Sequence, residues 1–174
     1  MIAQPSFVTL VLPAALAAAL AQSACDPVRS DQISALGGET NGVGPGPTHR
    51  PGQPCLLCHD GKLGNPVEFA VAGTVFRFAS DRQPVSGATV TLRGADGSTF
   101  DASTNTAGNF YVLAQEWTPA YPMRVSIAGE GRSVDMKTHI GRDGSCAGCH
   151  FDPAGPDSYG HVSLVDPFAD AAAP

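Results

Sequence analysis

The chain is poor in charged residues, and its first 24 residues have none. Lys, Arg, Asp and Glu make up 15% of the 174 residues, and Met1 to Ala24 contains no charged side chain. Ten basic residues against 16 acidic ones give a formal net charge of −6. This balance excludes the broad basic surface that nucleic acid binding needs, and it favours basic protein partners.

The only long hydrophobic run is too short to cross a bilayer. Phe7 to Ala21 is almost wholly apolar, whereas a membrane-spanning helix needs roughly 20 such residues. A short apolar run followed by small residues predicts a signal peptide over residues 1–24, although no Lys or Arg precedes the run. We therefore expect export, to the periplasm or the cell surface.

The end of this segment leaves two cleavage points open. Ala19-Leu20-Ala21 suits an ordinary signal peptidase, whereas Ser23-Ala24-Cys25 resembles a bacterial lipoprotein junction. Four of the five cysteines belong to two motifs described below, and Cys25 is left over. A lipidated Cys25 would attach the chain to a membrane, such as the outer membrane, and a free thiol is the alternative.

Lys and Glu are scarce while Gly (20) and Pro (15) are abundant, which excludes a helical bundle. The remaining 150 or so residues suffice for one domain with a core. Short apolar runs separated by turn residues predict an antiparallel β-sandwich and a mainly-β fold class. The runs are Ala70–Ala79, Ala88–Leu92, Asn109–Ala114, Met123–Ile127 and Ser133–Lys137.

The amino-acid sequence of this region resembles that of a known family. Gly73-Thr74-Val75, the run from Pro84 to Leu92 and the run from Thr104 to Val112 resemble the carboxypeptidase regulatory-like domain. That resemblance covers about 70 residues and implies a transthyretin-like sandwich, but no chemistry. No His-Glu-x-x-His sequence occurs, which excludes the zinc peptidases that carry this motif.

Two pentapeptides contain the candidate cofactor-binding residues. Cys55-Leu56-Leu57-Cys58-His59 and Cys146-Ala147-Gly148-Cys149-His150 both match Cys-x-x-Cys-His, the attachment motif of c-type haem. In this motif the two thiols bond the two vinyl-derived carbons of the porphyrin, and the imidazole that follows can bind iron.

The two motifs and their flanks resemble those of multihaem c-type cytochromes. The resemblance implies two covalent haems c, with thioethers at Cys55, Cys58, Cys146 and Cys149 and proximal ligands at His59 and His150. It also implies electron transfer with redox partner proteins and no catalysis.

Three other interpretations stay open. Two Cys-x-x-Cys pairs could form a Cys₄ zinc site, or they could be disulfides, in a secreted sandwich that acts as a binding or scaffold module. Neither needs a histidine after each second cysteine. A haem with an open axial position would instead make the chain a peroxidase or a sensor.

The remaining histidines are candidates for the distal iron ligands. Thr48-His49 precedes the first motif and Thr138-His139 precedes the second, so the two sites look like repeats. His49, His139 and His161 are therefore the candidate distal ligands, and we expect bis-His haems.

Met123 and Met136 lie in phase with apolar strand positions, and we expect them in the core. The aromatic side chains Tyr111, Trp117, Tyr121 and Tyr159 are expected in the core or at its rim, with stacking on a porphyrin as the alternative.

The predicted organisation places a haem segment on each side of the sandwich, and we expect the two segments to meet at one end or edge of it. The segments are the signal peptide (1–24), an irregular linker (25–47), the first haem segment (48–66), the sandwich (67–137), the second haem segment (138–165) and a disordered tail (166–174).

Overall fold

The computed structural model describes residues 26–39, 42–63 and 65–165. The predicted signal peptide, Cys25 and the predicted disordered tail lie outside the described residues. By its contacts the chain divides into two parts, Met1–Gly37 and Gly38–Pro174. All strands and both Cys-x-x-Cys-His motifs belong to the second part.

The first part contains a short helix, α2 (Pro27–Ala35). Asp26 caps it, because its Oδ1 accepts a hydrogen bond of 3.1 Å from the backbone N–H of Arg29, and a proline occupies the first turn. The prediction of irregular chain over 25–47 is wrong for these nine residues. Among the described residues, no helix combines the length and hydrophobicity that crossing a membrane requires.

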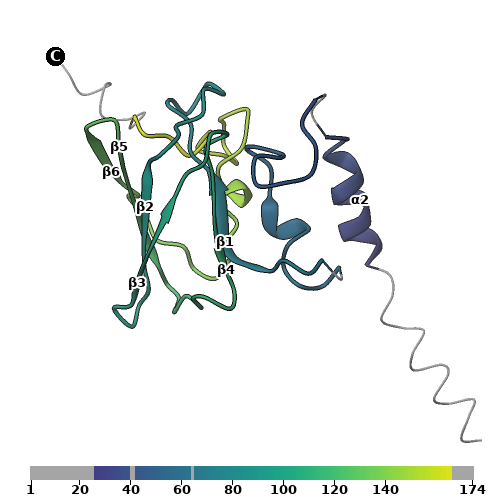
Figure 1. The fold of residues 1–174 in the computed structure, drawn as a ribbon, viewed down its shortest axis with the longest axis horizontal. Coiled ribbons are helices and arrows are strands. Elements are labelled where there is room, and N and C mark those ends of the chain that lie inside the picture. Colours follow the sequence, from purple (N-terminus) through teal and green to yellow (C-terminus); the bar gives the residue numbers. More distant parts are fainter. Residues whose placement is uncertain (1–25, 40–41, 64, 166–174) are drawn as a thin grey trace, which may run out of the picture. The chain divides into compact units, whose positions relative to one another are not determined.

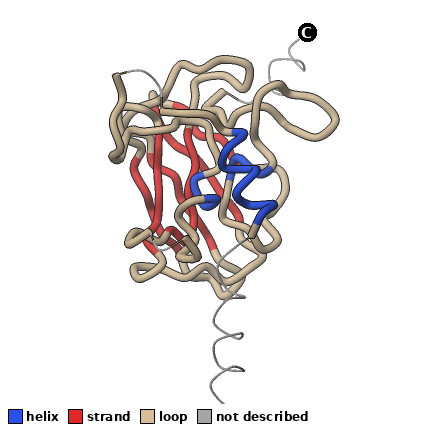
Figure 2. Tube along the Cα trace, turned by 90° about the vertical axis from the view of Figure 1, so that its right-hand side faces the viewer, coloured by secondary structure: helices blue, strands red, loops and turns tan. Residues whose placement is uncertain are grey.

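The second part is mainly β, and the predicted fold class is confirmed (Figures 1 and 2). The smaller sheet pairs β1 (Phe69–Thr74) with β4 (Asn109–Leu113), and the larger sheet has the order β3-β2-β5-β6. Every pair of neighbouring strands is antiparallel. The strands of the larger sheet are β2 (Thr89–Arg93), β3 (Thr99–Ser103), β5 (Arg124–Gly129) and β6 (Arg132–Asp135).

The core lies between the two sheets. Val90 and Leu92 of β2 are fully buried while the residues between and around them are not, which is the period-2 pattern of a strand with one buried face. Val71 of β1 and Val112 of β4 meet them from the other sheet. Met123 is also fully buried, as predicted.

The predicted second haem segment (138–165) lies along the free edge of β1 and the residues that follow it. The backbone N–H of Ala72 donates to Gly144 O at 3.0 Å, and that of Phe76 donates to Val162 O at 2.9 Å. A Cβ at residue 144 would collide with the carbonyl oxygen of Ala70, so this close approach requires glycine. These contacts fix the backbone on both sides of the second motif against the sandwich.

Candidate functional site

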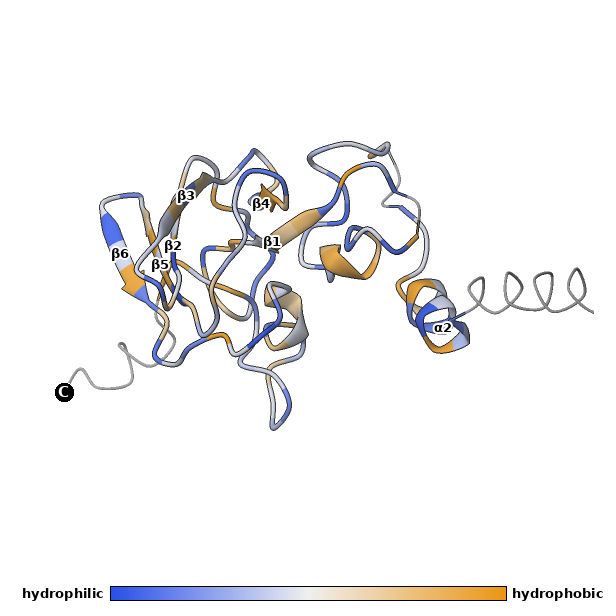
Figure 3. Cartoon of the chain, turned by 90° about the horizontal axis from the view of Figure 1, so that it is seen from below, coloured by the Kyte–Doolittle hydropathy of each residue, from blue (hydrophilic) through white to orange (hydrophobic). Residues whose placement is uncertain are grey.

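The two Cys-x-x-Cys-His motifs adopt the same local fold. Each begins with a 3₁₀ turn, η2 (Cys55–Leu57) or η3 (Cys146–Gly148). In both turns the N–H of the second cysteine donates to the carbonyl of the first, at 3.2 Å. Side chains three residues apart eclipse in a 3₁₀ turn, so the paired thiols lie on one side. Figure 3 shows η2 as strongly hydrophobic and η3 as less so.

Both motif histidines are held in the same tautomer. Nδ1 of His59 lies 3.0 Å from Val67 O, and Nδ1 of His150 lies 3.1 Å from Gly160 O. A carbonyl can only accept, so Nδ1 is the donor in both rings, and the neutral form of each ring has its lone pair on Nε2. Metal-binding histidines are oriented by the same kind of bond. Burial lowers the pKa of His150, although its bond to Gly160 acts in the opposite direction. The burial thus favours the neutral form of the ring, which is the form that binds a metal.

Aromatic rings and a second histidine surround His59. Its ring stacks on Phe69 with centres 4.5 Å apart, and Phe69 stacks in turn on Tyr111 at 4.7 Å. Tyr111 is 39% exposed, so it lies beside the candidate ligand and outside the core. The ring centre of His49 lies 6.0 Å from that of His59, at an interplanar angle of 65°. At a metal–nitrogen distance of about 2 Å, two imidazoles that bind one metal can have their ring centres about 6 Å apart.

Charged groups adjoin His49. Its Nδ1 lies 3.5 Å from Glu39 Oε1, which is longer than an ordinary hydrogen bond. The same oxygen accepts a bond of 2.8 Å from Arg50 Nε, and Arg50 also donates to Gln53 at 2.8 Å. At the first site, His59 therefore contacts a stack of aromatic rings, and the ion pair between Glu39 and Arg50 adjoins His49.

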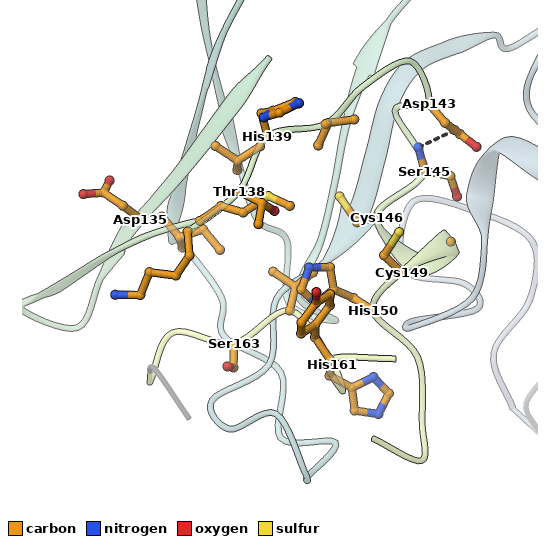
Figure 4. Close-up of a pocket in the computed structure, with 18 of the residues that line it drawn as sticks. Asp135, Thr138, His139, Asp143, Ser145, Cys146, Cys149, His150, His161 and Ser163 are labelled. Atoms are coloured by element: carbon orange, nitrogen blue, oxygen red, sulfur yellow. Dashed lines mark hydrogen bonds between the residues drawn. The ribbon is translucent and has the colours of Figure 1, made fainter. Parts of the chain in front are cut away.

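The second motif borders a cavity of about 500 Å³ (Figure 4). This volume lies within the range of cofactor and small-molecule sites. Cys146, Cys149 and His150 lie along one side, and His139 comes from the 138–143 segment across the cavity. The walls are mainly apolar and include Phe110, Val125, Ile127, Val134, Met136, Ile140 and Val162. Met136 was predicted to be a core residue, but it is half-buried and lines the cavity because β6 has already ended at Asp135.

His161 is buried without a hydrogen-bond partner on either ring nitrogen. It is 5% exposed and packs on Phe76 with ring centres 4.5 Å apart. Its Cε1 would lie 3.6 Å from a Cβ placed on Gly52, which precedes the first motif. In Figure 4 the ring lies far from the Cys146 and Cys149 sulfurs. The His161 side chain thus lies where the 138–165 segment meets the 48–66 segment, and it also lines the cavity.

The pKa values of two thiols reflect their burial. Burial raises the pKa of Cys55 to about 11 and that of Cys146 to about 12. A negative charge on Cys55 also raises the pKa of Cys146, so the two sulfurs lie within electrostatic reach of each other. As free thiols, both are protonated at neutral pH and are weak nucleophiles.

Both motifs contact the same strand. η2 and η3 each pack against β1, the N–H of Phe69 donates to His59 O at 2.8 Å, and a Cβ on Gly73 would lie 2.8 Å from Cys146 Sγ. The 48–66 and 138–165 segments therefore both contact one strand, which agrees with the expectation that they meet at one edge of the sandwich.

The described part of the chain contains both potential metal ligands and thiols. Within residues 26–39, 42–63 and 65–165, no group of three or more His, Cys, Asp or Glu side chains gathers to hold a metal ion. The four motif cysteines are free thiols.

Sequence reasoning missed several residues around the motifs. Phe69 and Gly52 gave no signal because their roles depend on chain segments far apart in sequence. Tyr159 was expected in the core or at its rim, yet it is 62% exposed with its ring centre 6.0 Å from that of His150. The aromatic stack could not be inferred before β1 and β4 were paired.

Comparisons with protein-family models, curated proteins and solved structures give no match for this chain. The two resemblances described from the sequence therefore stay predictions.

Proposed function

We propose that this chain is an exported c-type cytochrome that holds two covalent haems and transfers electrons between protein partners. One observation carries the proposal: the two Cys-x-x-Cys-His turns have the same local structure. In each turn, Nδ1 of the histidine is hydrogen-bonded to a backbone carbonyl, and Nε2 is left available to bind iron. Attached haem supplies an iron centre that exchanges single electrons.

At the first site, Cys55 and Cys58 hold the porphyrin and His59 binds the iron. The 6.0 Å separation of the rings of His49 and His59 supports His49 as the second histidine that would hold this iron. Val67 O favours the tautomer of His59 with the proton on Nδ1, so Nε2 would be the nitrogen available to bind the iron.

At the second site, Cys146 and Cys149 hold the porphyrin and His150 binds the iron. His139 is proposed as its distal ligand, because Thr138-His139 repeats Thr48-His49 and because His139 and His150 line the same cavity. Two histidine ligands on each iron leave no position for a substrate, so the chain is proposed to be an electron carrier and not an enzyme.

The redox partner is expected to present a basic surface, since the chain has a net charge of −6 and haem propionates add to it. Signal cleavage places the protein in the periplasm or at the cell surface. Lipidation of Cys25 would add a membrane anchor.

A direct test is expression of the full chain with haem-attachment machinery, followed by a mass measurement and a visible spectrum after denaturation. We expect two covalent haem masses. Cys55→Ala/Cys58→Ala and Cys146→Ala/Cys149→Ala serve as matched variants, and each should lose one haem. A mature chain with the mass of its amino acids alone, colourless after denaturation, contradicts the proposal. Bound zinc would then favour the scaffold interpretation.

A further inference from the structure

The two layers of the sandwich differ in width. The smaller sheet has two strands, β1 and β4, while the larger sheet has four. Part of the inward face of the larger sheet therefore has no strand opposite it. Strand pairing identifies this part, because Ile127 of β5 pairs with Val134 of β6, and the two side chains lie on the same face.

The cavity beside the second motif occupies this gap between the layers. Its walls include Val125 and Ile127 of β5, Val134 of β6 and Phe110 of β4. Ile127 and Phe110 also belong to the buried core, with exposures of 6% and 2%. The cavity is therefore an open continuation of the hydrophobic core, and η3 lies at its border.

The first motif lies on the other side of the smaller sheet. Along β4, Phe110 and Val112 are buried in the core, and Tyr111 between them is exposed and points the opposite way. Phe69 stacks on Tyr111, and His59 stacks on Phe69. His59 is thus positioned over the outer face of the β1–β4 sheet, outside the core.

We propose that the second haem fills the cavity and takes the place of a third strand in the smaller layer, whereas the first haem lies outside the core. This inference rests on the proposed function. The cavity suits a flat, mainly apolar tetrapyrrole because its walls are apolar, and Cys146, Cys149 and His150 line it. Loading of the second site then completes the core, and loading of the first site does not.

The first experiment blocks the cavity. Val134→Trp should fill the space and reduce haem attachment at Cys146 and Cys149 at least tenfold, with the first site still loaded. Ser133→Trp is the matched control, since Ser133 neighbours Val134 on the strand but is exposed on the opposite face. Tryptic cleavage after Lys62 separates the two motifs, so the haem on each peptide can be weighed. Full loading of both sites in Val134→Trp would overturn the inference.

The second experiment stays decisive if Val134→Trp does not fold. Thermal unfolding of Cys146→Ser/Cys149→Ser is compared with that of Cys55→Ser/Cys58→Ser. A change of 1 kcal/mol in the free energy of unfolding shifts the thermal midpoint of a domain of this size by about 2–8 °C. On this scale, we expect the loss of the second haem to lower the thermal midpoint by ~10 °C or more. The loss of the first haem should have less than half that effect. Equal shifts, or a larger shift for the first pair, would refute the inference. A wild-type chain without haem would instead refute the proposed function.

Discussion

The two predicted haem segments share one pentapeptide pattern and one turn geometry, but they have different surroundings. His59 lies against a stack of aromatic rings, 6.0 Å from His49 and close to an ion-paired loop. His150 faces an apolar cavity that continues the core. Burial, hydrogen bonding and nearby charge all tune a metal site. A repeated motif on this scaffold is therefore expected to produce two electron sites that differ from each other.

The largest expected effect is the opening of one haem at a time by removing its distal ligand. His49→Ala should leave the first iron with an open position, so that half of the ferrous haem binds carbon monoxide. His139→Ala should open the other half. The measurement is the visible difference spectrum with carbon monoxide, with the unsubstituted chain expected not to respond.

Glu39→Gln is the control for the first site, because it alters the carboxylate near His49 and leaves the imidazole in place. It should not create a position for carbon monoxide. A His49→Ala protein that ignores carbon monoxide would mean that His49 is not an iron ligand, and carbon monoxide binding by the unsubstituted chain would favour a peroxidase or sensor.

A second prediction concerns the contact between β1 and the second motif. A Cβ at residue 73 would lie 2.8 Å from both Cβ and Sγ of Cys146 and 3.0 Å from the Phe110 ring. Gly73→Ala should therefore displace η3, lower the free energy of unfolding by about 1–3 kcal/mol and reduce haem loading at the second site only. Urea unfolding and the mass of each motif peptide measure the two effects.

Gly148→Ala is the matched substitution, since a Cβ there meets nothing within 4 Å and the Cys-x-x-Cys-His pattern is kept. It should behave like the unsubstituted chain. A similar loss in both variants would show that the contact with β1 does not position the motif.

The strands were predicted where one face is buried. Val90 and Leu92 alternate with polar residues and lie in β2, and the predicted runs at 109–114 and 123–127 overlap β4 and β5. Strand β3 (Thr99–Ser103) was missed because only Ala102 on it is buried, so its hydrophobic pattern is weak. The hydrogen bonds of β3 come from its pairing with β2, which a local pattern does not contain.

The candidate site likewise has a part that the sequence predicts and a part that it does not. The attachment residues and the proximal histidines follow from local spacing, and the sequence is sufficient to propose them. The cavity was not predictable, because its walls come from β4, β5, β6 and the segment after them, which meet only in the folded chain. His161 likewise acquires its neighbours Phe76 and Gly52 through tertiary packing.

A third prediction tests whether His161 serves either site. Neither of its nitrogens has a partner, and a neutral imidazole always carries one N–H donor. An unsatisfied buried donor costs about 1–3 kcal/mol, so His161→Phe should raise the free energy of unfolding while keeping the packing on Phe76. Urea unfolding measures the change. Both haem spectra should stay low-spin, and a high-spin haem in this variant would instead identify His161 as an iron ligand.

The smallest expected effect lies in the β2–β3 turn, remote from the Cys-x-x-Cys-His turns in sequence. Hydrogen bonds from the Ser98 side chain and backbone lower the pKa of the exposed Asp96 below its ordinary value of 3.8. A lowered folded-state pKa stabilises the fold above that ordinary value, and the contribution is lost as the pH falls through the lowered one. Asp96→Asn should therefore reduce the thermal midpoint slightly at pH 7, and the difference from the unsubstituted chain should vanish in acid. Both haem spectra should stay unchanged, because this turn supports the sandwich alone. A spectral change at either haem would mean that the turn affects the haem segments. The larger sheet would then also contribute to the difference between the two sites.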